Sequence, residues 1–168
     1  MHSIKETKEA ATKKYDLLAE KFQKLYTEGS ERSSSGMKKA LEASRSQLVT
    51  AGTFTAEQSH DFKRYMARDL EQTINEFQQL GAATKQSLSP SRIGSGALSS
   101  LVAILEVSGN ALQSLGDKAK AKLTYKTGEI TSAGTLHCNA CHHALTVTTT
   151  GHIPPCPECE ATEFTKSY

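Results

Sequence analysis

Four cysteines near the C-terminal end constrain this chain more than any other feature of its sequence. They form two C-x2-C pairs, Cys138 with Cys141 and Cys156 with Cys159, and 14 residues separate the two pairs. A C-x2-C turn directs two thiolates toward one ion, and the intervening residues suffice for a strand, a turn and a return strand. The spacing therefore predicts a single tetrahedral site with four thiolate ligands.

Three kinds of site use cysteine pairs of this type. Disulfides are disfavoured because the N-terminal residues are polar, unlike an export signal, and cytosolic thiols stay reduced. Iron sites of the rubredoxin kind share the pattern, but the gap here is short, and Phe164 and Tyr168 are the only aromatic residues after Cys138. The spacing favours one structural zinc ion. Four thiolates leave no open coordination position, so catalysis at the metal is not expected.

The segment around the cysteines has the pattern of short strands. Leu145 and Val147 alternate with threonines, as in a half-buried strand, and Phe164, Lys166 and Tyr168 fall on one face of a later strand. We expect three strands here. Apolar residues are few after residue 134, so the segment needs a bound metal, which contributes ~10–16 kcal/mol, or a surface on which to dock.

Four histidines lie close to the cysteines, namely His137, His142, His143 and His152. One interpretation is a second metal site or a replacement ligand. Because four thiolates already complete a tetrahedron, we expect the histidines to surround the zinc site or to be exposed, not to bind the ion.

The first 125 residues are predicted to be helical. In the first helix, apolar side chains recur every three or four positions: Ile4, Ala11, Tyr15, Leu18, Phe22 and Leu25. A second helix is predicted over 37–50, a third opens with the capping box Thr55-Ala-Glu-Gln58 and extends to about Ser87, and a fourth covers 97–123 with a kink near 108–110.

The predicted fold is mainly α. A long antiparallel helical hairpin or bundle occupies residues 1–125, with the second and third helices as the hairpin and the other two covering its open face. A small C-terminal β zinc ribbon follows over 126–168. The two parts are treated as separate domains because the helices carry their own apolar stripes.

Four segments resemble a known family: Thr-Gly-Glu-Ile at 127–130, Gly-Thr-Leu-His-Cys-Asn-Ala-Cys-His at 134–142, Ile-Pro-Pro-Cys-Pro-Glu-Cys at 153–159, and Thr-Glu-Phe at 162–164. They are similar to a bacterial family of short zinc-ribbon-containing proteins of unknown function, which also place charged helices before a C-terminal ribbon. The resemblance implies the ribbon fold and zinc, and it implies no activity. Glu160 departs from the many ribbons that place glycine after the last cysteine, where φ is positive.

The sequence contains no motif of a known catalytic class. Walker A, H-E-x-x-H and G-x-S-x-G sequences are all missing, so we do not expect an enzyme. Asp61, Arg64 and Arg68 stand at helical spacing and are interpreted as a solvated, salt-bridged helix face. What remains is a non-enzymatic zinc-binding adaptor or regulatory protein with a helical interaction surface.

Charge separates that adaptor from the main alternative, a zinc ribbon that binds nucleic acid or acts in a ribosome or transcription complex. The whole chain carries a net charge of +2. From residue 134 onward, Lys166 is the one base against three glutamates, and phosphate binding favours the opposite sign. The basic cluster before the ribbon is small, and it consists of Lys118, Lys120, Lys122 and Lys126. We therefore favour a protein partner, and the nucleic-acid alternative stays open.

Self-association and location follow from the apolar pattern. Leu17 and Tyr26 form a second apolar line beside the first stripe, and one neighbouring helix is not expected to cover both lines. This predicts a homo-oligomer formed by the first and third helices. No apolar run approaches the ~20 residues that cross a bilayer, so a cytoplasmic protein without a membrane span is expected.

Overall fold

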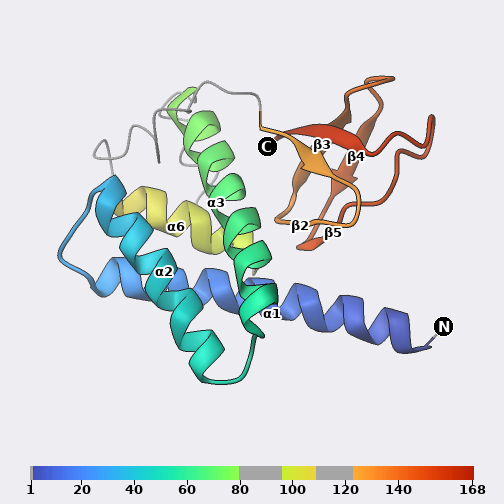
Figure 1. The fold of residues 1–168 in the computed structure, drawn as a ribbon. Coiled ribbons are helices and arrows are strands. Elements are labelled where there is room, and N and C mark those ends of the chain that lie inside the picture. The colour runs from blue at the N-terminus through green and yellow to red at the C-terminus, as the bar shows by residue number, and fades with distance from the viewer. Residues whose placement is uncertain (1, 80–95, 109–122) are drawn as a thin grey trace.

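A computed structural model describes residues 2–79, 96–108 and 123–168 (Figure 1). Four helices are described first along the chain: α1 (His2–Glu28), α2 (Ser34–Thr50), α3 (Ala56–Gln79) and α6 (Ala97–Ser108). Six short strands follow: β1 (Tyr125–Lys126), β2 (Ile130–Thr131), β3 (Gly134–Cys138), β4 (Ala144–Val147), β5 (Gly151–His152) and β6 (Glu163–Ser167). The predicted fold, helices followed by a small C-terminal β ribbon, is confirmed.

Local signals in the sequence set the helix starts. The Ser33 hydroxyl accepts a hydrogen bond of 3.1 Å from the Gly36 N–H and so caps α2. At α3 the predicted capping box is present, because the Gln58 N–H donates to the Thr55 hydroxyl at 3.2 Å and the Thr55 N–H donates to the Gln58 side chain at 3.5 Å. Each cap satisfies amide groups that have no partner within the helix.

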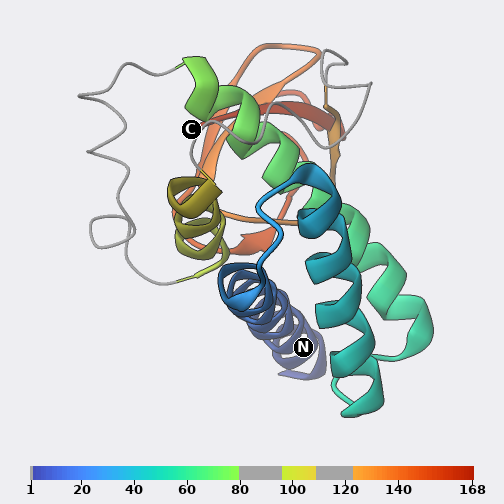
Figure 2. The same cartoon turned by 90° about the vertical axis from the view of Figure 1, so that its left-hand side faces the viewer.

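Helix α1 lies at the centre of the helical part. Figure 2 views it nearly along its axis, with α6 on one side and α2 on the other, and α3 packs against α2 as the returning arm of the predicted hairpin. The core is aromatic where α1 meets α3, since the ring centroids of Tyr15 and Phe62 lie 6.1 Å apart and those of Phe54 and Phe62 lie 4.9 Å apart. These rings hold the hairpin against α1.

Both apolar lines of α1 are largely covered within one chain. Tyr15, Leu18 and Phe22 are fully buried, Tyr26 is 2% exposed, and Leu17 is 40% exposed. A single neighbouring helix was not expected to cover both lines. Three helices, α2, α3 and α6, cover them together. The oligomer prediction assumed that these apolar lines remain exposed within one chain, and they do not. A homo-oligomer therefore stays a prediction that these contacts do not support.

The fourth predicted helix begins where the sequence indicated. The Ala97 N–H donates to the Asp16 carboxylate at 2.8 Å, so a side chain of α1 caps the first turn of α6. The described part ends at Ser108, whose hydroxyl donates to the Tyr26 hydroxyl at 2.8 Å. The predicted continuation over 109–122, most of the predicted kink, and the end of the third helix near residue 87 lie outside the described residues, and Leu123, the predicted end of the fourth helix, is not helical.

The C-terminal part contains two antiparallel sheets. Four strands are arranged in the order β1-β6-β3-β4, and β2 pairs with β5. The predicted strand over Leu145 and Val147 is β4, and the predicted last strand over Phe164 and Lys166 is β6. The third predicted strand was not placed at particular residues, and the structure adds β1, β2, β3 and β5. Phe164 on β6 is fully buried against Leu136 and the two buried cysteines, Cys138 and Cys156. The small apolar core of the ribbon thus lies directly under the cysteine loops.

The ribbon packs against the helices through α3. In Figure 1, α3 stands between the ribbon and the helices α2 and α6, and most of its contacts with the ribbon are made to β2 and β6. A second contact joins α1 to the segment before β5, where the Thr150 hydroxyl donates to Asp16. Among the described residues, no helix is both long enough and apolar enough to cross a membrane.

Candidate metal centre and its attachment to the helices

The four predicted cysteines converge on one point. The Sγ atoms of Cys138 and Cys159 lie 3.6 Å apart, those of Cys141 and Cys156 lie 3.5 Å apart, and all four lie within 4.8 Å of one another. A tetrahedral ion with Zn–S bonds of ~2.3 Å requires sulfur atoms about 3.8 Å apart. The four cysteines are therefore positioned to bind one metal ion.

The two cysteine loops share the same backbone geometry. The N–H of His142 donates to the Cys138 carbonyl at 3.0 Å, and the N–H of Glu160 donates to the Cys156 carbonyl at 2.9 Å. Both donors have positive φ, 62° at His142 and 59° at Glu160. The departure noted at Glu160 thus does not change the turn, because the glutamate adopts the left-handed conformation in which glycine is common. The sequence did not reveal the same conformation at His142.

The thiols cannot all ionise without a cation. The N–H of Cys141 points at the Cys138 sulfur and lowers the pKa of that thiol to about 6. At Cys141 the N–H of His143 has the same effect, but the surrounding cysteine side chains outweigh it and raise the pKa of the Cys141 thiol to about 12. A bound dication removes this repulsion and allows four thiolate ligands. The donor set therefore fits zinc, which would hold the two loops together.

The four histidines do not join the ligand group. Among the described residues, the group positioned to hold an ion contains the four cysteines and no histidine. His137 Nε2 lies 3.0 Å from the Ser167 hydroxyl, and His152 Nδ1 lies 3.1 Å from the Gly128 carbonyl. His143 lies 3.9 Å from Glu158, and His142 is exposed. Three of the histidines therefore make local polar contacts around the ribbon.

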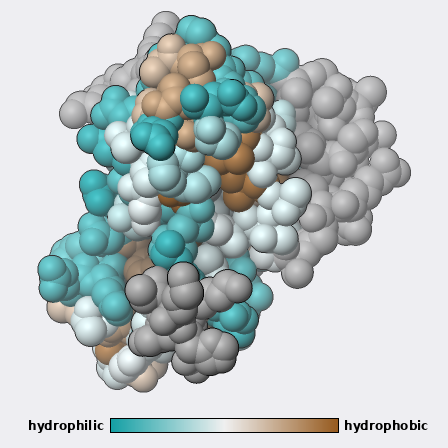
Figure 3. All heavy atoms as spheres, turned by 90° about the vertical axis from the view of Figure 1, so that its right-hand side faces the viewer, coloured by the Kyte–Doolittle hydropathy of each residue, from teal (hydrophilic) through white to brown (hydrophobic). Residues whose placement is uncertain are grey.

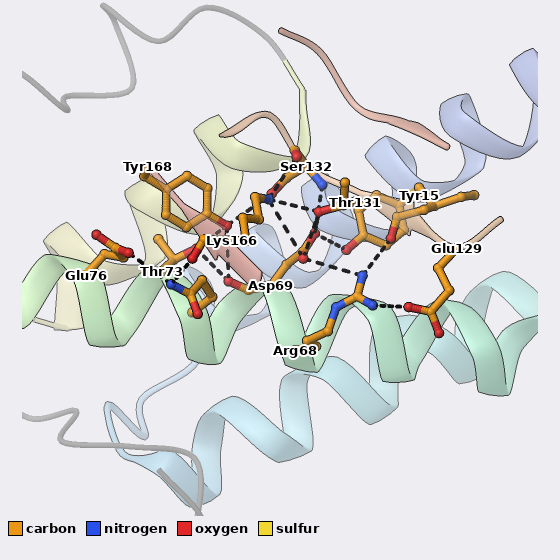
Figure 4. A network of polar contacts seen from close by, with 12 residues as sticks. Tyr15, Arg68, Asp69, Thr73, Glu76, Glu129, Thr131, Ser132, Lys166 and Tyr168 are labelled. Atoms are coloured by element: carbon orange, nitrogen blue, oxygen red, sulfur yellow. Dashed lines mark hydrogen bonds and ion pairs between the residues drawn. The ribbon is translucent and has the colours of Figure 1, made fainter. Parts of the chain in front are cut away.

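A buried carboxylate joins α3 to the ribbon (Figure 4). Asp69 is fully buried, and its Oδ2 accepts hydrogen bonds of 2.7 Å from the Tyr15 hydroxyl and 2.7 Å from the Ser132 N–H. The Thr131 hydroxyl donates to its Oδ1 at 3.1 Å. Tyr15 belongs to α1, Thr131 to β2, and Ser132 follows β2. The Asp69 side chain of α3 therefore connects α1 and α3 with the ribbon.

A buried lysine on β6 completes this contact. Lys166 Nζ donates to the Thr131 hydroxyl at 2.9 Å and to the Ser132 carbonyl and hydroxyl at 2.8 Å each, and it lies 3.9 Å from Asp69 Oδ1. It also lies 4.5 Å from the centre of the Tyr168 ring. Burial lowers the pKa of Lys166 to about 8, although Asp69 opposes this effect. All three ammonium hydrogens thus have acceptors within the interface.

Arg68 forms the second charged pair of the interface. Its guanidinium bonds Glu129, donates to the Ile130 carbonyl at 2.9 Å, and lies 3.9 Å from the centre of the Tyr125 ring. With Asp69 and Lys166, the interface contains two positive and two negative side chains. Opposite charges balance where water is excluded, which reduces the cost of burying each of them.

The prediction that Arg68 lies on a solvated helix face is wrong. Its side chain is 11% exposed, whereas Arg64, which pairs with Asp61 at 3.1 Å on that face, is 65% exposed. Asp69 was not identified from the sequence at all. It follows Met66 at helical spacing on the buried side of α3, and a carboxylate on an apolar stripe was the available signal of a buried partner.

Comparison with known proteins agrees with the fold and the site. The model of the family described as Zinc-ribbon containing domain matches residues 23–167, which include most of the helical part as well as the ribbon. The chain therefore belongs to this family, and the resemblance noted from the cysteine segments is confirmed. A search of the curated proteins and a search of the solved structures each returned no match.

Proposed function

We propose that the protein is a non-enzymatic adaptor in which one structural zinc ion holds the ribbon and the helices present it to a protein partner. The observation that carries this proposal is the attachment of the ribbon to α3. Asp69 and Lys166, both fully buried, fix the ribbon relative to the helices, while Cys141 and Cys159 lie at the exposed side of the metal centre. A fixed, outward-facing ribbon suits recognition of another molecule.

The features of the metal centre support a structural role over catalysis. Four thiolates fill the coordination sphere, and a catalytic zinc requires a free position for water or substrate. The central charged pair of the α3 interface does not reach solvent, because the side chains of Asp69 and Lys166 are each 0% exposed. A substrate has no access to them there.

The surface charge supports a protein partner over nucleic acid. Glu158, Glu160 and Glu163 are exposed on the ribbon, whereas its one base after residue 134, Lys166, is buried. Lys126 is near Glu163, with 3.6 Å between the charged groups, and the other three lysines of the predicted basic cluster lie outside the described residues. Phosphate groups favour clustered, solvent-accessible bases.

The described part of the helical surface offers little apolar area for a stable homo-oligomer. Among the described residues, Leu17 and Val107 are the only large apolar side chains that are exposed, and the face in Figure 3 is mainly hydrophilic with small apolar patches. A homo-oligomer built on the described helix surfaces would therefore use mainly polar contacts. We place the adaptor in the cytoplasm, where thiols remain reduced and available for zinc.

A pull-down from the native cell tests the adaptor function. The tagged, zinc-loaded chain is compared with a Glu158→Lys, Glu160→Lys variant that retains zinc but inverts the charge of the ribbon surface. We expect specific protein partners with the native chain and a reduced yield with the variant. Recovery of ribosomal or polymerase subunits only in the presence of nucleic acid, abolished by nuclease, contradicts the proposal.

A further inference from the structure

The two edges of the ribbon sheet are built differently. β1, at one edge, contains two residues and carries Lys126, which faces Glu163 across 3.6 Å. β4, at the other edge, contains four residues in an unbroken register with β3, its only partner among the described strands. Proteins commonly protect an exposed edge by a short strand, a lysine, a proline or a bulge. β1 is short and carries a lysine, whereas β4 contains no lysine, proline or bulge.

The register shows which backbone groups of β4 are free to pair. The Cys138 N–H donates to the His143 carbonyl at 2.9 Å, so these two residues form a hydrogen-bonded pair. Antiparallel ladders alternate bonded and non-bonded pairs, and every second residue after His143 therefore bonds to β3. Ala144 and Thr146 alternate with these bonded residues, so their N–H and C=O groups point toward the open edge. Both side chains are also exposed.

Charge distinguishes one end of this edge from the other. Residues 139–157 contain no Asp, Glu, Lys or Arg. Exposed Glu158 and Glu160 follow directly, and Glu158 lies 3.9 Å from His143, the residue before β4. Four thiolates around one dication leave additional negative charge close by. The end of β4 near the metal centre is therefore acidic, and the rest of the strand is neutral.

We infer that β4 is a docking edge that accepts an extended peptide segment of a protein partner as a fifth strand, with a lysine or arginine of the segment beside Glu158 and Glu160. Main-chain hydrogen bonds to Ala144 and Thr146 provide the affinity, and the acidic end sets the preference for a basic side chain. A second copy of β4 fits less well, because residues 139–157 offer these glutamates no lysine or arginine. The inference rests on the proposed adaptor function and specifies the chemistry of the partner.

Three synthetic peptides test the edge on the zinc-loaded full chain. The first alternates valine and threonine over eight residues with two lysines at one end, the second replaces the lysines by glutamates, and the third is the lysine peptide with alternate backbone nitrogens methylated. We expect the lysine peptide to shift the Ala144 and Thr146 amide resonances and to slow their hydrogen exchange. The other two peptides should bind at least about tenfold more weakly, because each lacks one part of the recognition.

Variants of one position separate backbone pairing from side-chain contacts. Thr146→Pro removes an outward N–H without removing a bond to β3, so zinc binding should persist while the affinity for the lysine peptide falls at least about tenfold. The matched variant Thr146→Ala keeps that N–H and should bind within about twofold of the native chain. If Thr146→Pro loses zinc, the comparison of the lysine peptide with its methylated form gives the same information.

Three results would overturn the inference. The first is a lysine peptide that leaves the Ala144 and Thr146 amides unchanged. The second is equal binding of the methylated peptide. The third is protection of these amides that rises with protein concentration in the absence of peptide, which assigns the edge to a second copy. Any of these results together with a successful pull-down rejects the β4 edge alone and retains the adaptor function.

Discussion

The helical core and the contact between α3 and the ribbon are both buried, yet they consist of opposite kinds of side chain. Within the helices, Tyr15 and Phe62 pack ring against ring. On the face of α3 that lies against the ribbon, Asp69 and Arg68 contact charged and polar groups of the ribbon. Apolar packing depends on volume and tolerates change, whereas a buried charge requires each partner in its place. The ribbon contact is therefore the more specific and the more vulnerable of the two regions.

Loss of the metal should have the largest effect and should distinguish the two regions. A Cys156→Ser variant lacks one thiolate, so the ribbon should lose its zinc and unfold, because bound zinc contributes ~10–16 kcal/mol to a fold of this kind. The helices have their own core, and most of the far-ultraviolet helicity should remain. Metal analysis and circular dichroism provide the two measurements. Loss of most helicity would show that helices and ribbon form one cooperative unit.

Removal of the buried carboxylate should have the next largest effect. Asp69→Ala leaves the Lys166 ammonium without its opposite charge and the Ser132 N–H without its acceptor, and uncompensated buried charge of this type costs about 3–5 kcal/mol of unfolding free energy. Asp61→Ala is the matched control, since it removes an exposed partner of Arg64 and should cost less than about 1 kcal/mol. Urea unfolding measures both. Equal effects of the two variants would contradict a tightly packed interface.

The pH dependence of stability gives an intermediate effect. Burial lowers the pKa of Lys166 to about 8, below the value near 10.4 of an unfolded lysine. Between these values the unfolded chain binds a proton that the folded chain does not, so this group makes the free energy of unfolding rise with pH, by about 3 kcal/mol in total. Lys166→Met lacks this contribution. The difference between native chain and variant, measured from pH 7.5 to 10, should increase in favour of the native chain, and a constant difference would contradict the assignment.

A change confined to the helical region should have the smallest effect. Thr55→Ala removes the hydroxyl that accepts from the Gln58 N–H, and loss of such a cap costs about 1 kcal/mol. Zinc content and the amide resonances of the ribbon should not change, because α3 begins on the side remote from the Asp69 contact. A variant that lost zinc would show that the two regions are more closely coupled than the contacts indicate.

The sequence predicted the parts of this protein that depend on local pattern. Cysteine spacing located the four thiols, and helical periodicity with the Thr55 capping box located α3. The pattern could not pair residues distant in sequence, and so it placed Arg68 in solvent although Glu129 lies against it in the fold. The positive φ of His142 was also hidden, because no glycine marks that turn. Long-range polar contacts and unusual backbone conformations require the assembled structure.

Hydrogen exchange on zinc removal tests the central claim most directly, namely that the folded ribbon is fixed on α3. The backbone amides of α3 around Asp69 and Thr73 are compared with those of α2 in the same sample, before and after chelation. We expect exchange near Asp69 and Thr73 to accelerate at least about tenfold while α2 remains protected, because the ribbon side of α3 loses its cover, whereas the main contacts of α2 are with α1 and α3. Unchanged protection of α3 in the zinc-free protein would contradict the claim.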